Sequence, residues 1–95
     1  MAAWLAERRL KQVSRRLRTL RDELRVIDDQ LAHLADEAGD MGLRALVSET
    51  AGSAHEYREA QAHADAMAQH RAHVVASIVE LEQRQDQLLD SLGAR

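Results

Sequence analysis

The sequence predicts an all-α protein: a long antiparallel two-helix coiled-coil hairpin, two copies of which associate into a four-helix bundle. Three observations predict this fold. Apolar residues recur at alternating intervals of three and four residues along most of the chain. There is no proline and there are only four glycines, so little interrupts a regular backbone. Only two residues are aromatic, which argues against a β-sandwich.

The length of the chain limits it to one small domain. We expect a single helical-hairpin domain over residues 1–95. The absence of cysteine excludes disulfides, thiol catalysis and thiolate metal sites. No apolar stretch is long enough for a signal peptide or for crossing a bilayer, so the sequence predicts a cytoplasmic protein without membrane contact.

The first helix is expected over about residues 3–38. Its apolar positions alternate in spacing without a slip, which is typical of the seam of a coiled coil. The seam consists of Leu10, Val13, Leu17, Leu20, Leu24, Ile27, Leu31, Leu34, Ala38 and Met41. Gly39 is expected to end this helix, because glycine adopts the left-handed conformation of a helix C-cap without strain.

A bend over residues 39–53 is expected to lead into a second helix over about residues 54–92. Ser53 and Glu56 have the spacing of a capping box at the start of that helix. The second seam consists of Tyr57, Ala60, Ala64, Met67, Arg71, Val74, Ile78, Leu81, Gln85, Leu88 and Leu92. Eight of the seam residues are expected to be largely buried: Leu17, Leu20, Leu24, Ile27, Leu31, Val74, Ile78 and Leu81.

The similar lengths of the two helices favour an antiparallel hairpin, because both seams are then buried along their whole length. If residue 38 lies opposite residue 54, the numbers of any two residues that face each other across the hairpin add to about 92. Arg71 and Gln85 are polar residues at seam positions, where such residues commonly fix the register of a coiled coil. In this register the expected partner of Arg71 is Glu23, with Asp22 as the alternative.

One seam between two helices makes a thin core, and chains of this size often gain stability by associating. The second helix has a wider apolar face than one seam requires. Ala68, Val75 and Leu89 each lie one position beyond a seam residue. We therefore expect a homodimer in which these three residues contribute to the interface.

The charges of the chain are unevenly distributed. Residues 1–25 carry eight basic and three acidic side chains, whereas the remaining residues carry five arginines and thirteen acidic side chains. Non-specific contact with nucleic-acid phosphates is one interpretation, and pairing within the hairpin is the one we favour. The basic residues available for such contact are Arg8, Arg9, Arg15, Arg16 and Arg18.

The bend combines apolar side chains with charged ones. The residues concerned are Asp40, Leu43, Arg44, Leu46, Val47 and Glu49. Apolar side chains ringed by charge are typical of a docking site for a protein partner. We favour the alternative, in which Leu43, Leu46 and Val47 fold back and plug the open end of the hairpin.

Parts of the bend and the second helix resemble the Gre-type transcript-cleavage factors. The resemblance lies in Gly39-Asp40, Ser48-Glu49, residues 54–60, Ile78 and Leu81. Those factors insert an acidic coiled-coil tip into RNA polymerase, which implies that Asp40 and Glu49 are tip acids that help hold a catalytic metal. The chain departs from that family in three ways. About seven residues are inserted between Gly39-Asp40 and Ser48-Glu49, and the family's Asn and its globular second domain are missing. WXG-type secreted proteins share the length and hairpin shape, but the bend has no Trp-x-Gly. We infer membership of neither family.

No group of residues has the spacing of a catalytic or cofactor site. His63, His70 and His73 lack the further ligands that complete a metal site, so we expect surface histidines and neither metal nor cofactor. The first functional hypothesis is a non-enzymatic interaction protein (adaptor, scaffold or regulator) with an unidentified protein partner. The alternative is a nucleic-acid- or RNA-polymerase-associated regulator that uses the basic helix or the acidic bend.

Overall fold

The computed structural model describes residues 2–93. These residues form two α-helices and no strand. Helix α1 spans Ala2–Ser48, and helix α2 spans Ala51–Gly93. The all-α, antiparallel two-helix hairpin that the sequence predicts is therefore confirmed.

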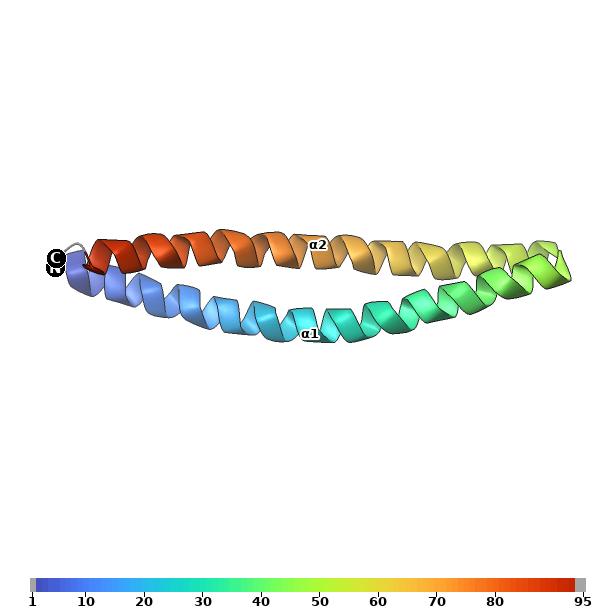
Figure 1. The fold of residues 1–95 in the computed structure, drawn as a ribbon, viewed down its shortest axis with the longest axis horizontal. Helices are drawn as coiled ribbons and strands as arrows, with labels where there is room; N and C mark the ends of the chain where they lie inside the picture. The colour runs from blue at the N-terminus through green and yellow to red at the C-terminus, as the bar shows by residue number, and fades with distance from the viewer. Residues whose placement is uncertain (1, 94–95) are drawn as a thin grey trace. The chain divides into compact units, whose positions relative to one another are not determined.

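Two compact units can be described along the hairpin. Unit 1 combines α1 up to Leu24 with α2 from His73 onward, and unit 2 covers residues 25–72 with the turn between the helices. Within each unit the two helical segments lie side by side and run in opposite directions. In Figure 1 these are the blue and red segments for unit 1 and the green and yellow segments for unit 2.

Each unit has a core of seam residues. The buried apolar side chains are Val13, Leu17, Leu20, Val74 and Ile78 in unit 1, and Ile27, Ala38 and Ala64 in unit 2. Of the eight residues expected to be largely buried, five are buried, and Leu24, Leu31 and Leu81 are half-buried. Burial of each large aliphatic side chain contributes about 1.5–3 kcal/mol, so the seam is the main stabilising feature of each unit.

The turn between the helices is much shorter than the expected bend over residues 39–53. Helix α1 continues for ten residues past Ala38, and only Glu49 and Thr50 lie between the helices. Gly39 therefore does not end α1, and the expected end was wrong. Glycine inside a helix costs about 1 kcal/mol relative to alanine, which is too little to stop a helix whose seam continues through Met41 and Ala45.

Glu49 ends α1 and Thr50 caps the start of α2, two roles that the sequence predicted for Gly39 and Ser53. Glu49 has the left-handed conformation of a helix C-cap, with φ of 51°, and its amide donates to the Ala45 carbonyl at 3.1 Å. The Ser53 amide donates to Thr50 Oγ1 at 3.1 Å, and the Thr50 amide donates to Ser53 Oγ at 3.3 Å. These two bonds form a capping box that begins at Thr50, three residues earlier than expected.

The short turn sets the register of the hairpin. In each of three facing pairs the residue numbers add to 99: Ser14 with Gln85, Asp28 with Arg71, and Gly42 with Tyr57. The expected register, near 92, is therefore wrong by one heptad. A shift of seven residues moves every seam residue to another seam position. The seam was predicted correctly for this reason, although the partners across it were not.

Candidate functional site

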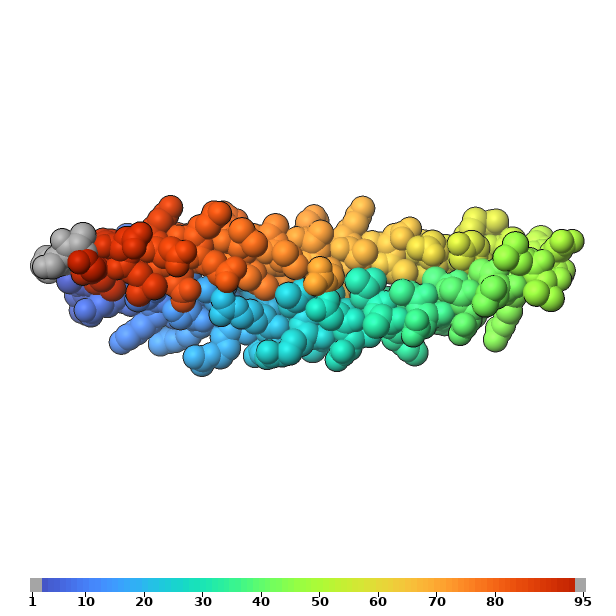
Figure 2. Space-filling model, in the orientation of Figure 1, coloured from blue at the N-terminus to red at the C-terminus, as the bar shows by residue number. Residues whose placement is uncertain are grey.

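The end of α1 carries three exposed apolar side chains, which we call the tip patch: Leu43, Leu46 and Val47. Their exposed fractions are 64%, 74% and 86%. Figure 2 shows side chains of this green segment projecting from the surface of unit 2. The interpretation that they plug the hairpin is wrong. Because α1 continues through Ser48, these residues lie on the outside of a helix and cannot fold back as a loop would.

A groove lies beside the tip patch in unit 2, with a volume of about 430 Å³. It is lined by Ala35, Ala38, Gly39, Gly42, Leu43, Leu46, Tyr57 and Gln61. Gly42 allows the Tyr57 ring to approach α1 closely, since a Cβ on Gly42 would lie 3.1 Å from Tyr57 Cε1. The groove and the tip patch together form a mainly apolar surface next to the turn.

The charged residues expected at the bend are all exposed. Asp40, Arg44 and Glu49 have no ion pair with any described residue, and Arg44 Nη1 lies 4.0 Å from Met41 Sδ. No group of three or more histidine, aspartate or glutamate side chains within residues 2–93 is arranged to hold a metal ion. The tip can therefore present charge to a partner around an apolar centre.

A second groove in unit 2 is lined by acidic side chains. Glu37, Glu56, Glu59 and His63 surround an apolar floor of Leu34, Met41 and Ala60. We call this the acidic groove. Glu59 lies 3.5 Å from His55 Nε2, an exposed contact that becomes an ion pair when the histidine is protonated. Neither Glu37 nor Glu56 has an ion pair with a described residue.

The five basic candidates do not share one surface. Arg9 and Arg16 line grooves in unit 1 together with Arg84 of α2. Glu80 also lines the larger of these grooves, so the surface has three arginines and one glutamate; we call it the basic groove. Arg8 instead lies over the Trp4 ring, 5.6 Å from its centroid. The two remaining candidates, Arg15 and Arg18, are exposed and line neither groove.

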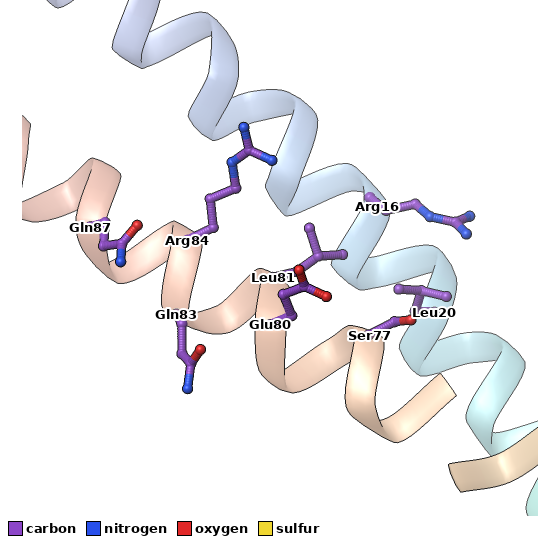
Figure 3. Close-up of a pocket in the computed structure, with 8 residues that line it drawn as sticks. All are labelled: Arg16, Leu20, Ser77, Glu80, Leu81, Gln83, Arg84 and Gln87. Carbon is purple, nitrogen blue, oxygen red and sulfur yellow. The ribbon is translucent and has the colours of Figure 1, made fainter. Parts of the chain in front are cut away.

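Figure 3 shows the larger part of the basic groove, which has a volume of about 530 Å³. Arg84 extends from α2 toward α1, and Leu81 points toward α1 between the helices. Sequence reasoning missed Arg84. Its spacing from the seam was a usable signal, because it lies one position before Gln85 and therefore borders the seam.

The polar residues at seam positions have partners that the sequence did not predict. Arg71 Nε donates to Asp28 Oδ1, and both side chains are about half exposed. The expected pairing of Arg71 with Glu23 or Asp22 is wrong, because the register differs by one heptad. Gln85 Nε2 donates to Ser14 Oγ at 3.1 Å, in a partly buried position. A role of Arg71, Gln85 and Glu23 in setting the register stays a prediction.

The residues expected at a dimer interface are partly accessible. Ala68 is exposed, Val75 is half-buried and Leu89 is 50% exposed. On α2, Glu82 lies one heptad from Val75 and from Leu89, and its carboxylate is 3.1 Å from Arg21 Nη2. The assignment of these residues to an interface stays a prediction. The Arg21–Glu82 ion pair already joins the two helices on the same side of α2.

These surfaces define a class of protein: a two-helix antiparallel coiled-coil hairpin with shallow open grooves. Comparison of the chain with protein-family models, with curated proteins and with solved structures found no match. Neither helix, over the part of the chain that is described, has a stretch both long and apolar enough to cross a membrane.

Proposed function

We propose that this chain is a non-enzymatic coiled-coil interaction protein, an adaptor, scaffold or regulator, that binds a protein partner through the turn and its exposed helix faces. The tip patch carries this proposal. Its three large apolar side chains are each more than half exposed at the end of helix α1. A partner that buried them fully would gain about 1.5–3 kcal/mol from each one.

The charge around the tip patch indicates the chemistry of the partner. Residues 36–59 carry six acidic side chains and two arginines. A docking segment with a complementary surface is apolar at its centre and flanked by lysine or arginine. The partner of the tip patch is therefore proposed to be a protein segment of this apolar and basic kind.

Self-association and location belong to the same proposal. A chain whose units have one seam each gains buried apolar area by pairing with a second copy, so we propose a homodimer. The proposed location is the cytoplasm.

The tip patch can be tested by site-specific photo-crosslinking. A crosslinking residue at position 43 should capture a peptide that is apolar and basic, whereas the same residue at position 62 on α2 should not. Leu46→Ser together with Val47→Ser should abolish the capture, because these changes remove most of the apolar surface. Val26→Ser is the matched control, since Val26 is an exposed valine of α1 outside the tip patch. Capture that is equal at both positions, or unchanged in the double variant, would contradict the proposal.

A second candidate function is a nucleic-acid- or RNA-polymerase-associated regulator. It is favoured by the basic groove, where Arg9, Arg16 and Arg84 have no ion pair with a described residue. Fluorescence anisotropy with duplex DNA at several salt concentrations tests it. Each phosphate contact contributes about 0.9 to the slope of log K against log salt, so Arg9→Gln with Arg16→Gln should lower that slope by about 2.

A further inference from the structure

One face of α1 in unit 1 carries a row of cations, which we call the basic stripe: Arg8, Lys11, Arg15 and Arg18. Successive members are three or four residues apart, a spacing that places side chains on the same face of a helix. All four are exposed, whereas the seam residues Val13 and Leu17 between them are buried. In Figure 2 side chains of this blue segment project on the side away from α2. The basic stripe therefore faces solvent.

The charges of the basic stripe are not neutralised within the described chain. None of its four side chains has an ion pair with a described residue. Residues 4–18 contain one acidic side chain, Glu7, which lies outside the spacing of the stripe, and Asp22 is the next position at which the spacing continues. Like charges three and four residues apart destabilise a helix. A ligand that carries several negative charges would relieve this repulsion.

An exposed aromatic ring lies at the start of the basic stripe. Trp4 continues the same spacing, four residues before Arg8, and it is 61% exposed. The guanidinium carbon of Arg8 lies 5.6 Å from the centroid of the Trp4 ring, within the range of cation–π attraction. This contact keeps the ring beside the first cation of the stripe. The exposed part of the ring is available to a ligand that is both aromatic and negatively charged.

We infer that the basic stripe and Trp4 bind single-stranded nucleic acid. The four cations contact phosphates of the strand, and the Trp4 ring stacks on an unpaired base. Proteins that bind single strands combine these two features, a basic track for the backbone and aromatic rings for the bases. The inference rests on the second candidate function, for which it names the form of the nucleic acid. It uses neither the tip patch nor the three arginines of the basic groove.

The geometry of the basic stripe favours a single strand over a duplex. Arg8 and Arg18 are ten residues apart, which is about 15 Å along the helix, and the cations between them lie in one row on a convex surface. A flexible strand can follow this row with its phosphates and turn a base toward Trp4. In a duplex each base is already stacked between its neighbours, so a base would have to be unstacked before it could cover the ring.

An anionic membrane surface fits the same residues less well. A helix that lies in a membrane interface buries a continuous apolar face in the lipid. In unit 1 the apolar seam of α1 packs on α2, and the large apolar side chains exposed on α1 there are Trp4 and Leu5. Cations occupy the rest of the exposed stripe, so there is little apolar area to insert. The combination of one ring and four cations favours nucleic acid.

The fluorescence of Trp4 tests the stacking contact, because the chain has no other tryptophan. An oligothymidylate of about ten nucleotides should quench this fluorescence as a base stacks on the ring. The anisotropy of the same oligonucleotide, labelled with a dye, gives the Kd. Trp4→Ala should raise the Kd about tenfold and leave its salt dependence unchanged, because it removes the ring and no cation. Trp4→Phe should recover part of the affinity, because it restores a ring.

The salt dependence of the Kd tests the phosphate contacts. Each contact with a single strand contributes about 0.7 to the slope of log K against log salt, so four contacts predict a slope of about 2.8 in magnitude. Lys11→Gln should lower this slope by about 0.7, and Lys11→Gln with Arg15→Gln by about 1.4. Arg58→Gln is the matched control, since it removes one charge from an exposed position of α2 in unit 2 and should leave the slope unchanged. Circular dichroism should show the same helix content in every variant, because the substituted side chains are exposed.

Several outcomes would overturn the inference. They are unquenched Trp4 fluorescence at saturating oligonucleotide, a slope that Lys11→Gln and Arg58→Gln change equally, and a duplex of the same length that competes as well as the single strand. Tighter binding to vesicles of phosphatidylglycerol and phosphatidylcholine than to the oligonucleotide would overturn it in favour of a membrane surface. Duplex binding through Arg9 and Arg16, and photo-crosslinking at the tip patch, are read separately. Failure of the basic stripe therefore leaves both candidate functions open to their own tests.

Discussion

Glu49 occupies a backbone conformation that few side chains adopt. Within residues 2–93 it is the non-glycine residue with a positive φ, at 51°. The left-handed conformation costs an L-residue about 1–2 kcal/mol, and glycine is the usual residue at this position after a helix. The turn therefore keeps a strained, exposed carboxylate at the tip, beside the tip patch.

Replacing Glu49 with glycine should stabilise the hairpin. Relief of the left-handed strain, less the greater freedom of glycine in the unfolded chain, should raise the free energy of unfolding by about 0.5–1 kcal/mol. Urea denaturation followed by circular dichroism measures this change. Glu49→Ala is the matched control, because it removes the carboxylate and keeps the strain. An equal gain in both variants would show that the charge, and not φ, is responsible.

At the scale of the element, α1 continues through two glycines. Gly39 and Gly42 have different surroundings, although they are three residues apart on the same helix. Apart from its chain neighbours and the nearby backbone of α1, no atom lies within 4 Å of a Cβ placed on Gly39, whereas a Cβ on Gly42 meets the Tyr57 ring at 3.1 Å. Gly39 therefore has no packing role within the described chain, and Gly42 allows α2 to pack closely near the turn.

The two glycines should respond oppositely to substitution by alanine. Gly39→Ala should raise the free energy of unfolding by about 0.8–1 kcal/mol, because alanine is the better helix former and the site is open. Gly42→Ala should gain less or lose stability, since Tyr57 must move to admit the new methyl group. Thermal unfolding of the two variants side by side measures the difference. Equal stabilisation would mean that the Tyr57 ring yields without cost.

The sequence contains enough information for both helices but not for the end of α1. The spacing of the seam predicts the helices, because any amphipathic helix of this pattern must bury that face. The end was misplaced because Gly39 and the Ser53–Glu56 spacing are local signals, and tertiary packing of Met41 and Ala45 prevailed over them. The true capping box, Thr50 with Ser53, uses a serine in place of the usual Glu or Gln.

At the scale of the whole hairpin, polar contacts distinguish between registers that the apolar seam accepts equally. A slip of one heptad keeps every seam position filled by a seam residue. It would separate Gln85 from Ser14 and Arg71 from Asp28, and would leave the partly buried Gln85 amide without its partner. The candidate grooves depend on this choice, so they could not be located from the periodicity alone.

Engineered cysteines can test the register directly, because the chain has no cysteine of its own. Ser14→Cys with Gln85→Cys should be joined by a short bifunctional thiol reagent, since the native side chains of this facing pair meet at 3.1 Å between Gln85 Nε2 and Ser14 Oγ. Ser14→Cys with Ile78→Cys would face each other in the register that adds to 92, and should be joined much less. Mass spectrometry of the products distinguishes the two. Preferential joining of positions 14 and 78 would contradict the register.

The two-residue turn also determines the order in which the hairpin can fold. Gly42 and Tyr57 are 15 residues apart in sequence, Asp28 and Arg71 are 43 apart, and Ser14 and Gln85 are 71 apart. Closing the widest loop first would cost the most chain entropy, whereas closing successive layers outward from the turn adds little at each step. Folding should therefore begin at the capped turn and proceed toward the chain ends. Destabilising substitutions at the turn should slow folding, and those near the chain ends should mainly speed unfolding.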